Sequence, residues 1–366
     1  MKPLKILHLS SEVSWRGGEQ QIAYLIEELV SAGHTCEILG RDNSAFEHYA
    51  RKENLRFHGV SYSGVGLIKT AFLLKKISSK YDIVHAHSGK SHTLTFLALL
   101  AGMRTPVVLS RRVDFVPKKN FFTQWKYNHL GIKRIIGVSN AITEIMRSYL
   151  TKKRERCITI HSGIDLRRFS DIQKKSLRSI LELPKGCFLL GNTSALADHK
   201  DYFTFLKVAE VLSNKDAAYH FVIMGDGPMA NEVKSFARDL NLMDRVTFTG
   251  FLNTIPEVLG DLNVFLMTSK TEGLGTSILD AFASRVPVVA TKAGGIPEMV
   301  IHESTGLIAD VGDVDTLAKN VERLKANVQL AQELVSNASS KLLEFTKEKT
   351  AKRTLDIYYE ILNTSG

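Results

Sequence analysis

The chain has 366 residues, of which 44% are hydrophobic and 23% are charged, and it carries a net charge of +10. This length exceeds one ordinary core and predicts two domains, and the composition is that of a globular protein. No apolar stretch is long enough to span a bilayer, the first residues do not read as a signal peptide, and three widely spaced cysteines favour a reducing cytoplasm and offer no metal-site spacing.

Short runs rich in β-branched residues alternate with helical patterns through the first half of the chain. A helix is predicted over residues 20–32, preceded by a glycine loop and ended by Gly33. This rhythm is typical of a parallel sheet with helices on both faces. The predicted strands are residues 5–10, 35–39, 83–87, 106–110 and 135–139.

A second series of the same kind begins near residue 188. A crossover is predicted at residues 161–169, and an amphipathic segment over residues 355–362 closes the chain. The sequence therefore predicts an α/β protein with two doubly wound domains, whose loops would line a cleft between two facing sheets. The predicted strands of the second domain are residues 188–192, 220–225, 246–250, 264–267 and 286–291.

Positive charge is concentrated in the first half. Residues 1–165 contain 25 Lys and Arg against 13 Asp and Glu, whereas residues 166–366 contain 23 against 25. A basic half indicates an acidic partner, which is anionic lipid, a phosphorylated acceptor or nucleic acid. The alternative is a charged surface that serves only solubility.

The most informative segment is residues 271–280, which joins a predicted strand to a helical pattern. It places Glu272 in a glycine loop and Asp280 inside the helix. Gly273 and Gly275 let backbone amides approach a phosphate, and carboxylates accept hydrogen bonds from sugar hydroxyls, so the segment suits a nucleotide-sugar. In the alternative interpretation, Glu272 is an acid favoured by the helix dipole and Asp280 is a solvated helix residue.

Two further glycine pairs and one lysine also follow predicted strands. Gly17 and Gly18 do not form the dinucleotide fingerprint, but their amides can face a diphosphate. The pair at residues 294–295 precedes a Pro-Glu helix start, which again exposes amides. Lys200 can neutralise a diphosphate as it leaves. The alternatives are flexible loops, ordinary strand-to-helix turns and a solvated lysine.

Two histidines and two arginines lie at the ends of other strands. Alternation puts His85 and His87 on one face of a strand, and His87 suits a sugar hydroxyl. A metal site is rejected here, because no third ligand has matching spacing. Arg111 and Arg112 suit an anionic acceptor. The alternatives are hydrogen-bonded structural histidines and surface arginines.

Residues 118–127 mix basic and aromatic side chains. Such a segment suits a membrane interface, although it also suits stacking on nucleic acid or a partly buried helix with a charged face. No nucleic-acid motif is present, so nucleic acid is not expected as a partner.

Taken together, these pieces resemble the retaining glycosyltransferases of the GT-B fold, specifically glycosyltransferase family 4. The resemblance covers nearly the whole chain, and its strength lies in the order and spacing of motifs that are weak alone. In chain order they are Gly17-Gly18, residues 137–139, residues 161–165 with Phe169, residues 225–228, residues 272–275 with Asp280, residues 287–290 and residues 294–298.

The resemblance implies two Rossmann-like domains facing across a cleft. Residues 1–165 would form an acceptor-binding domain, with a C-terminal helix over about residues 350–366 packing back onto it. Residues 166–349 would form the nucleotide-sugar-binding domain.

The resemblance also implies roles for individual residues. Glu272 would face donor-sugar hydroxyls, Asp280 would hold ribose hydroxyls, and Lys200 would join the amides of Gly275 and Thr276 at the diphosphate. Similar enzymes need no divalent metal. The predicted site is then Glu272, Lys200 and His87 as catalytic residues, Gly17, Gly18, Gly273, Leu274, Gly275, Thr276 and Asp280 for the donor, and Arg111 and Arg112 for the acceptor.

Three residues depart from the family pattern. Asp280 stands where Glu is usual, Ala195 stands where an arginine is common, and Arg112 stands where a histidine is common. The first two bear on ribose and diphosphate binding. The third indicates a different or more acidic acceptor.

We therefore expect a cytoplasmic glycosyltransferase that moves a sugar from a nucleotide-diphosphate-sugar to a lipid-linked or polysaccharide-assembly acceptor, without a cofactor. Peripheral contact with the inner face of the membrane through the basic first domain is a further expectation. The alternatives are a sugar-nucleotide epimerase or a phosphorylase on the same fold, or a non-catalytic two-domain protein that binds a small ligand.

Overall fold

The computed structural model describes residues 2–170, 172–184 and 186–364. The chain divides into two compact units, one containing Met1–Gly163 with Lys347–Gly366 and the other containing Ile164–Thr346. The first crossing between units lies two residues before the boundary expected from the sequence, at residue 165. The acceptor-binding and donor-binding roles of the two domains remain predictions.

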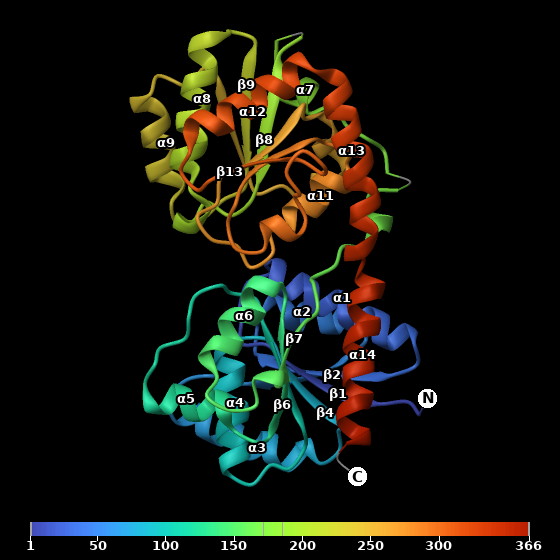
Figure 1. Ribbon diagram of the computed structural model, residues 1–366. Coiled ribbons are helices and arrows are strands. Elements are labelled where there is room, and N and C mark those ends of the chain that lie inside the picture. The colour runs from blue at the N-terminus through green and yellow to red at the C-terminus, as the bar shows by residue number, and fades with distance from the viewer. Residues whose placement is uncertain (1, 171, 185, 365–366) are drawn as a thin grey trace. The chain divides into compact units, whose positions relative to one another are not determined.

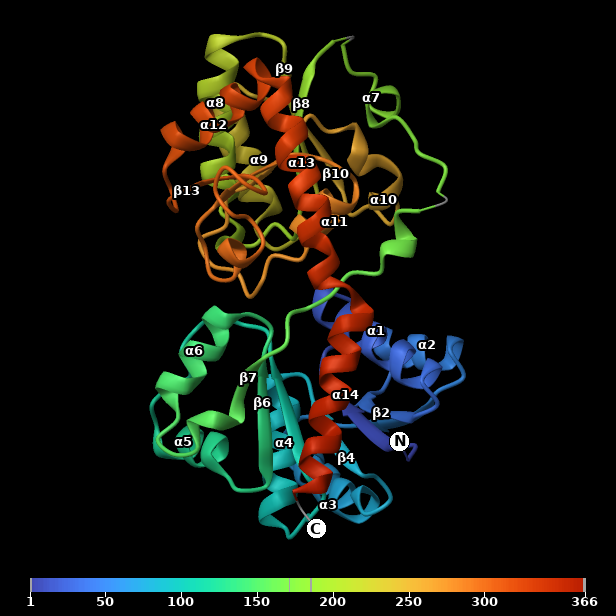
Figure 2. The same ribbon diagram turned by 45° about the vertical axis from the view of Figure 1, so that its right-hand side comes forward.

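The first unit is built on a parallel sheet of seven strands in the order β3-β2-β1-β4-β5-β6-β7 (Figures 1 and 2). Its elements are β1 (Lys5–Leu9), α1 (Gly17–Ser31), β2 (Thr35–Arg41), α2 (Ala45–Lys52), β3 (Arg56–Val60), α3 (Gly64–Ser78), β4 (Ile83–Ala86), α4 (Gly89–Leu100), β5 (Val107–Arg111), α5 (Phe121–Asn128), β6 (Ile132–Gly137), α6 (Asn140–Tyr149), β7 (Cys157–Thr159) and α14 (Lys347–Asn363).

Alternating side chains along these strands fill two separate cores. Ile6 of β1 packs with α1, α2 and α14, whereas its neighbour Leu7 packs on the other face with α3, α4, α5 and α6. Successive residues of a strand point to opposite faces, which explains why the strands carry continuous apolar runs. Helix α14 comes from the far end of the chain and lies along α1 (Figure 1).

The second unit repeats this architecture with a parallel sheet of six strands in the order β10-β9-β8-β11-β12-β13. Helices α8, α9 and α12 share a buried core on one face of the sheet, and α11 and α13 pack together. The elements are α7 (Leu177–Ile180), β8 (Phe188–Thr193), α8 (Tyr202–Lys215), β9 (Tyr219–Met224), α9 (Ala230–Asp239), β10 (Val246–Gly250), α10 (Ile255–Val258), β11 (Val264–Met267), α11 (Ser277–Ala283), β12 (Val288–Thr291), β13 (Leu307–Ala309), α12 (Val314–Ala326) and α13 (Val328–Leu342).

The structure corrects three details of the sequence-based assignment. Helix α1 begins at Gly17, so the glycine pair forms its first turn rather than a preceding loop. The segment after Gly295 forms only a short 3-10 turn, Ile296–Glu298, instead of a full helix. Three short strands, β3, β7 and β13, were not predicted, and all of them lie at or next to a sheet edge.

Among the described residues, no helix combines the length and the apolar character that crossing a bilayer requires.

Candidate active site

Both sheets change the direction of strand order at a point next to their first strand. In the first sheet β1 lies beside β4, and in the second β8 lies beside β11. Ligands of doubly wound sheets bind at the carboxyl ends of the strands at such a point. The first turn of α1, which follows β1, carries Gly17 and Gly18, and the loop after β4 carries His87. The segments after β8 and β11 carry Lys200 and Glu272.

Lys200 and Glu272 meet as an ion pair in the second unit. The Lys200 Nζ lies 2.5 Å from Glu272 Oε1, and Ser269 Oγ donates to the same carboxylate oxygen at 2.8 Å. Both charged side chains are largely buried. Thr268 Oγ1 donates to the Asp201 carbonyl at 2.9 Å, which ties the loop after β11 to the loop after β8. The two predicted residues are therefore adjacent, although 72 positions separate them in sequence.

The loop after β12 supports the Glu272 backbone. The Gly295 amide donates to the Glu272 carbonyl at 3.1 Å. Gly294 has a φ of +50°, and a Cβ atom built there would lie 1.9 Å from that carbonyl oxygen. Only glycine fits such a close approach. The expectation that this glycine pair offers free amides to a ligand is thus wrong for Gly295, whose amide is already used.

The segment from Gly273 to Asp280 begins with backbone amides that have no acceptor among the described residues. Helix α11 begins at Ser277, and Gly275 has a φ of +89°. In the described part of the chain, no hydrogen-bond acceptor faces the backbone amides of Gly275 and Thr276. The segment therefore presents unpaired donors beside the Lys200–Glu272 pair, as an anion site requires.

Asp280 lies one turn into α11 and is partly buried. Burial raises the pKa of its carboxyl group to about 6, and the charge of Arg168 opposes this rise. A carboxylate held above its ordinary pKa gains from a ligand that donates hydrogen bonds to it, such as a ribose diol.

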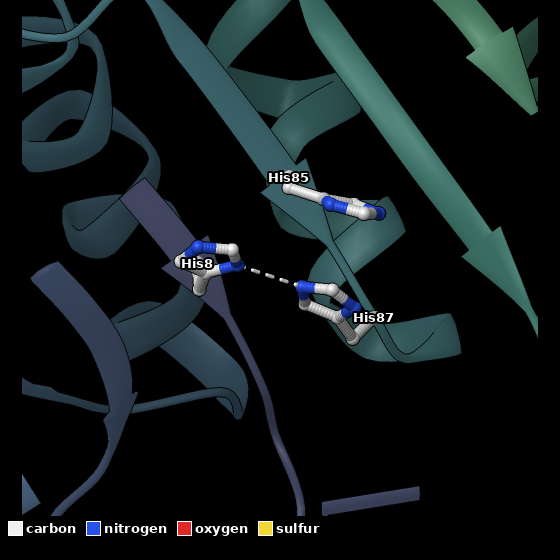
Figure 3. Close-up of side chains that lie close together, drawn as sticks. All are labelled: His8, His85 and His87. Atoms are coloured by element: carbon white, nitrogen blue, oxygen red, sulfur yellow. Dashed lines mark hydrogen bonds between the residues drawn. The ribbon is translucent and has the colours of Figure 1, made fainter. Parts of the chain in front are cut away.

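Three imidazoles gather at the switch point of the first sheet (Figure 3). His8 of β1 is paired in register with His85 of β4, and His8 Nδ1 lies 3.1 Å from His87 Nε2 in a hydrogen bond. Burial lowers the pKa of His8 to about 3 and the pKa values of His85 and His87 well below 6.5. All three rings are therefore neutral at pH 7, and His87 keeps a buried Nδ1 with no partner among the described residues.

His8 corrects the sequence-based reason for rejecting a metal site, because it supplies the third imidazole that spacing did not reveal. The ring arrangement does not favour a common metal ion. The His85 and His87 rings lie nearly over one another, with centroids 3.9 Å apart and planes inclined by 33° (Figure 3). Both ring nitrogens of His85 already make hydrogen bonds, to the hydroxyl groups of Tyr358 and Ser110, so the three imidazoles do not offer three unused nitrogens to one ion.

The charge of Arg112 contributes to the lowered pKa values of His85 and His87, and Arg112 in turn interacts with Glu19. Burial lowers the pKa of Arg112 to about 10, against the opposing charge of Glu19. Burial also raises the pKa of Glu19, whose carboxylate accepts a hydrogen bond from Ser10 at 3.3 Å. A Cβ atom on Gly18 would touch the Arg112 side chain at 3.7 Å, so the first turn of α1 faces this arginine. Arg112 also donates to Ser162 Oγ at 3.4 Å.

Arg111 does not share this environment. It is buried, donates to the Tyr127 hydroxyl at 3.0 Å and also donates to the Phe115 carbonyl. Its guanidinium group holds the loop after β5 against α5. The predicted acceptor pair is thus divided into Arg111, which makes internal contacts, and Arg112, whose charge acts on the histidines.

Two family models match the two halves of the chain. Residues 15–168 match "Glycosyltransferase Family 4", and residues 173–341 match "Glycosyl transferases group 1". The chain belongs to the family 4 type of GT-B glycosyltransferases. It is therefore an enzyme, and the family resemblance and the α/β fold expected from the sequence are confirmed.

Curated relatives of this glycosyltransferase cover most of its length. It is 28% identical over 309 residues to the UDP-Gal:alpha-D-GlcNAc-diphosphoundecaprenol alpha-1,3-galactosyltransferase of Escherichia coli, covering 81% of this chain and 79% of the relative. It is 26% identical over 300 residues to the putative glycosyltransferase EpsD of Bacillus subtilis strain 168, covering 78% of each chain.

Solved structures share the fold over the whole chain. A glycosyltransferase from Rickettsia africae ESF-5 superposes with a TM-score of 0.85 at 18% identity, covering 99% of both chains. Anabaena Alr3699/HepE, solved in complex with UDP and glucose, gives 0.83 at 20% identity, covering 98% of this chain and 100% of that one. The individual roles of Glu272, Lys200, His87 and the other site residues remain predictions.

Proposed function

We propose that this glycosyltransferase moves a hexose from a UDP-sugar to a lipid-linked acceptor, with retention of configuration at the anomeric carbon. The loops of the second unit bind the donor, and the switch point of the first unit binds the acceptor. The transfer belongs to the assembly of a cell-surface polysaccharide or glycolipid at the cytoplasmic face of a membrane.

The observation that carries the proposal is the set of groups beside the carboxyl ends of β8 and β11. An ammonium group, a carboxylate and two unpaired backbone amides lie there together. Such a set contains donors for a diphosphate and an acceptor for sugar hydroxyls. The uridine moiety is supported by the UDP-sugar in the name of the Escherichia coli relative and by the UDP in the Anabaena complex.

Donor binding would rearrange the Lys200–Glu272 pair. The diphosphate takes Lys200 and the amides of Gly275 and Thr276, and the sugar hydroxyls take Glu272. Negative charge grows on the diphosphate as the glycosidic bond breaks, so donors fixed around it stabilise the transition state. Asp280 accepts hydrogen bonds from the ribose hydroxyls.

The first unit supplies acceptor contacts. His87 presents its unpaired Nδ1 to a sugar hydroxyl, and His8 holds the other nitrogen of the ring. Arg112 is a guanidinium group in a desolvated environment, which suits a phosphate of a lipid-diphosphate acceptor. The proposed reaction uses no metal ion or other cofactor, since Lys200 and the amides supply the positive charge.

The test combines donor binding with product analysis. A thermal-shift series with UDP-, GDP-, ADP- and CDP-sugars should show stabilisation by one UDP-sugar, because a ligand that binds only the native state raises its stability. Transfer of that sugar to an undecaprenyl-diphosphate-sugar should then be followed in the presence of EDTA. The anomeric configuration of the product is measured by proton NMR.

Glu272→Gln should reduce the transfer rate by about 100-fold or more if the carboxylate contacts the transferring sugar. Glu303→Gln is the matched control, because Glu303 forms an exposed ion pair with Arg323 in the same unit. Undiminished transfer by Glu272→Gln would remove this residue from the mechanism. Conversion of the donor in the absence of an acceptor would favour the epimerase alternative instead.

A further inference from the structure

The excess of positive over negative charge lies in one segment of the first unit. Residues 61–135 contain 13 Lys and Arg but only two acidic residues, Asp82 and Asp114, which gives a net charge of +11. The remaining residues contain 35 Lys and Arg and 36 Asp and Glu, a net charge of −1. The segment includes α3, α4 and α5, and both views show α4 between the other two helices (Figures 1 and 2).

The same segment exposes an unusual amount of apolar surface. Twelve of the 22 large hydrophobic side chains that are exposed in the described chain lie between Val65 and Leu130. Scattered single cases are ordinary on a protein surface, but a local excess of this kind marks an interaction site. High positive charge and exposed aromatic residues therefore coincide.

Helix α3 shows this combination on its outward face. Thr70, Ala71 and Leu74 face the core, whereas Val65 and Phe72 are 69% and 57% exposed. With 3.6 residues per turn, one side of the helix collects positions 65, 68, 69, 72 and 76 in a single stripe. The stripe combines three apolar residues with Lys69 and Lys76. The solvent-facing side of α3 therefore carries both apolar and positively charged groups.

Helix α5 and the loop before it form a second such surface, defined as the α5 patch by Val113, Phe115, Val116, Lys118, Lys119, Phe121 and Trp125. Asn120 caps the helix by accepting from the Thr123 amide at 2.8 Å. Trp125 packs edge-on against buried Phe96 of α4, with ring centroids 5.0 Å apart. This contact holds α5 against α4, whereas the side chain of Phe121 remains 83% exposed.

We infer that the α5 patch, with the outer stripe of α3, docks onto an anionic lipid bilayer. Aromatic rings and lysines side by side suit the boundary between headgroups and acyl chains, where rings enter the apolar layer and ammonium groups meet lipid phosphates. The near absence of acidic residues argues against a basic protein partner, and the exposed rings argue against a purely electrostatic contact with nucleic acid.

The patch also lies next to the proposed acceptor contact. Arg112 directly precedes Val113, the first residue of the patch, and Arg111 holds the Phe115 carbonyl. Docking through the patch would therefore bring the headgroup of a membrane-embedded acceptor to the loop that carries Arg112. This consequence rests on the proposed lipid-linked acceptor, whereas vesicle binding itself does not.

The test is flotation of the full chain with vesicles of phosphatidylcholine, with and without phosphatidylglycerol, in the absence of donor. Binding should require phosphatidylglycerol and weaken with salt. Lys118→Ala/Lys119→Ala should lower the partition coefficient about 25-fold, since each lysine near an anionic surface contributes about fivefold. Phe121→Ser should lower it at least about tenfold, through loss of buried apolar area.

Matched controls come from exposed residues outside the segment. Lys319→Ala/Lys352→Ala removes the same charge, and Phe251→Ser removes a side chain that is 71% exposed in the second unit. Both should bind vesicles as the unchanged chain does. In a Trp15→Phe background, Trp125 is the one remaining tryptophan, and its emission should shift to shorter wavelength with anionic vesicles.

Three results would overturn the inference. They are equal loss of binding in the control variants, a self-association that Phe121→Ser abolishes, and tight binding of duplex RNA that depends on Phe121. UDP-sugar stabilisation should persist in every patch variant. Failure of the unchanged chain to bind anionic vesicles, with donor binding retained, thus refutes this surface alone, whereas absence of donor binding in the unchanged chain refutes the proposed function.

Discussion

At the scale of single residues, the Lys200–Glu272 pair is the central feature of the donor loops. Two buried opposite charges recover the cost of leaving water only when their geometry is good and further hydrogen bonds are present. The 2.5 Å contact and the Ser269 hydroxyl meet both conditions. A bound diphosphate can replace Glu272 as the partner of Lys200 without leaving either charge unpaired, because the sugar hydroxyls then serve the carboxylate.

Removing one member of this pair should destabilise the second unit. Lys200→Met leaves the buried Glu272 carboxylate with only the Ser269 hydroxyl, at a cost of about 3 kcal/mol in the free energy of unfolding. Urea denaturation measures this value. Lys215→Met is the control, because Lys215 pairs with Glu322 at a more exposed site and should cost less than about 1 kcal/mol.

The double variant Lys200→Met/Glu272→Gln measures the interaction energy between the two side chains. It should be more stable than Lys200→Met alone, because no buried charge is left without a partner. A double variant that is as unstable as the sum of the two single variants would show that the residues do not interact in solution.

The raised pKa of Asp280 predicts that its ionised carboxylate lowers the stability of the fold while it strengthens donor binding. Its pKa of about 6 lies above the ordinary aspartate value of 3.8, so the folded state binds more protons than the unfolded state between these pH values. The free energy of unfolding therefore falls as pH rises through this window, and Asp280→Asn removes the loss. The variant should be more stable than the unchanged chain at pH 7.5 by roughly 1–2 kcal/mol.

The same substitution should weaken UDP-sugar binding at pH 7.5, because an amide is a weaker acceptor for the ribose hydroxyls than a carboxylate. Donor affinity of the unchanged chain should also fall as pH drops below about 6. Thermal shift with and without donor measures both effects. If Asp280→Asn and the unchanged chain differed in free energy of unfolding by the same amount at pH 7.5 and at pH 4, the raised pKa would be contradicted.

At the scale of elements, the sequence identified the central strands because they carry long apolar runs. Five predicted strands of each domain correspond to strands of the observed sheets. The missed strands β3, β7 and β13 are short or partly exposed and lack such runs, so periodicity gives no signal for them. Glu272 and Lys200 were predicted as site residues because loops after parallel strands meet at one edge of a sheet.

His8 was missed for a physical reason of a different kind. It lies in an apolar strand, and a lone histidine there has no local motif. Its partners come from β4, and the pairing of His8 with His85 depends on the register between two strands 77 residues apart in sequence. Alternation places His8 on one face of its strand and His85 on one face of another. It predicts that the two lie together only once β1 and β4 are known to be neighbours.

A substitution at Gly294 tests whether the loop after β12 supports the loop that carries Glu272. Gly294→Ala places a Cβ atom 1.9 Å from the Glu272 carbonyl at a φ of +50°, so the loop must move. We expect at least about 2 kcal/mol of destabilisation and a clear loss of UDP-sugar binding. Gly260→Ala, whose Cβ atom meets only Ser284 O at 3.5 Å, is the control and should change donor binding little. Unaltered donor binding in Gly294→Ala would show that the Glu272 position does not depend on this contact.

At the scale of the whole chain, the polypeptide crosses twice between the two units, after Gly163 and after Thr346. The second crossing leads directly into α14, which was expected from sequence as a short amphipathic segment. The helix begins at Lys347, whose fully buried ammonium group lies 2.9 Å from Glu27 and 3.1 Å from Glu28 of α1. A buried lysine reads as a surface residue in sequence, which is why the helix start could not be predicted.

Helix α14 also reaches the histidine cluster, and this contact gives the last prediction. The fully buried Tyr358 and His85 Nδ1 are joined by a hydrogen bond of 2.6 Å, while Ser110 bonds the other ring nitrogen at 2.8 Å. Tyr358→Phe keeps the ring but leaves the buried Nδ1 unpaired, which should cost about 1–3 kcal/mol. The adjacent Tyr359 donates to the Lys2 carbonyl at 2.8 Å in an exposed position, so Tyr359→Phe should cost less than about 0.5 kcal/mol. Because Tyr358 belongs to the first unit and the donor loops belong to the second, UDP-sugar stabilisation should survive in both variants while acceptor turnover falls only in Tyr358→Phe. Equal turnover in the two variants would show that the C-terminal helix stabilises the first unit without positioning the histidines.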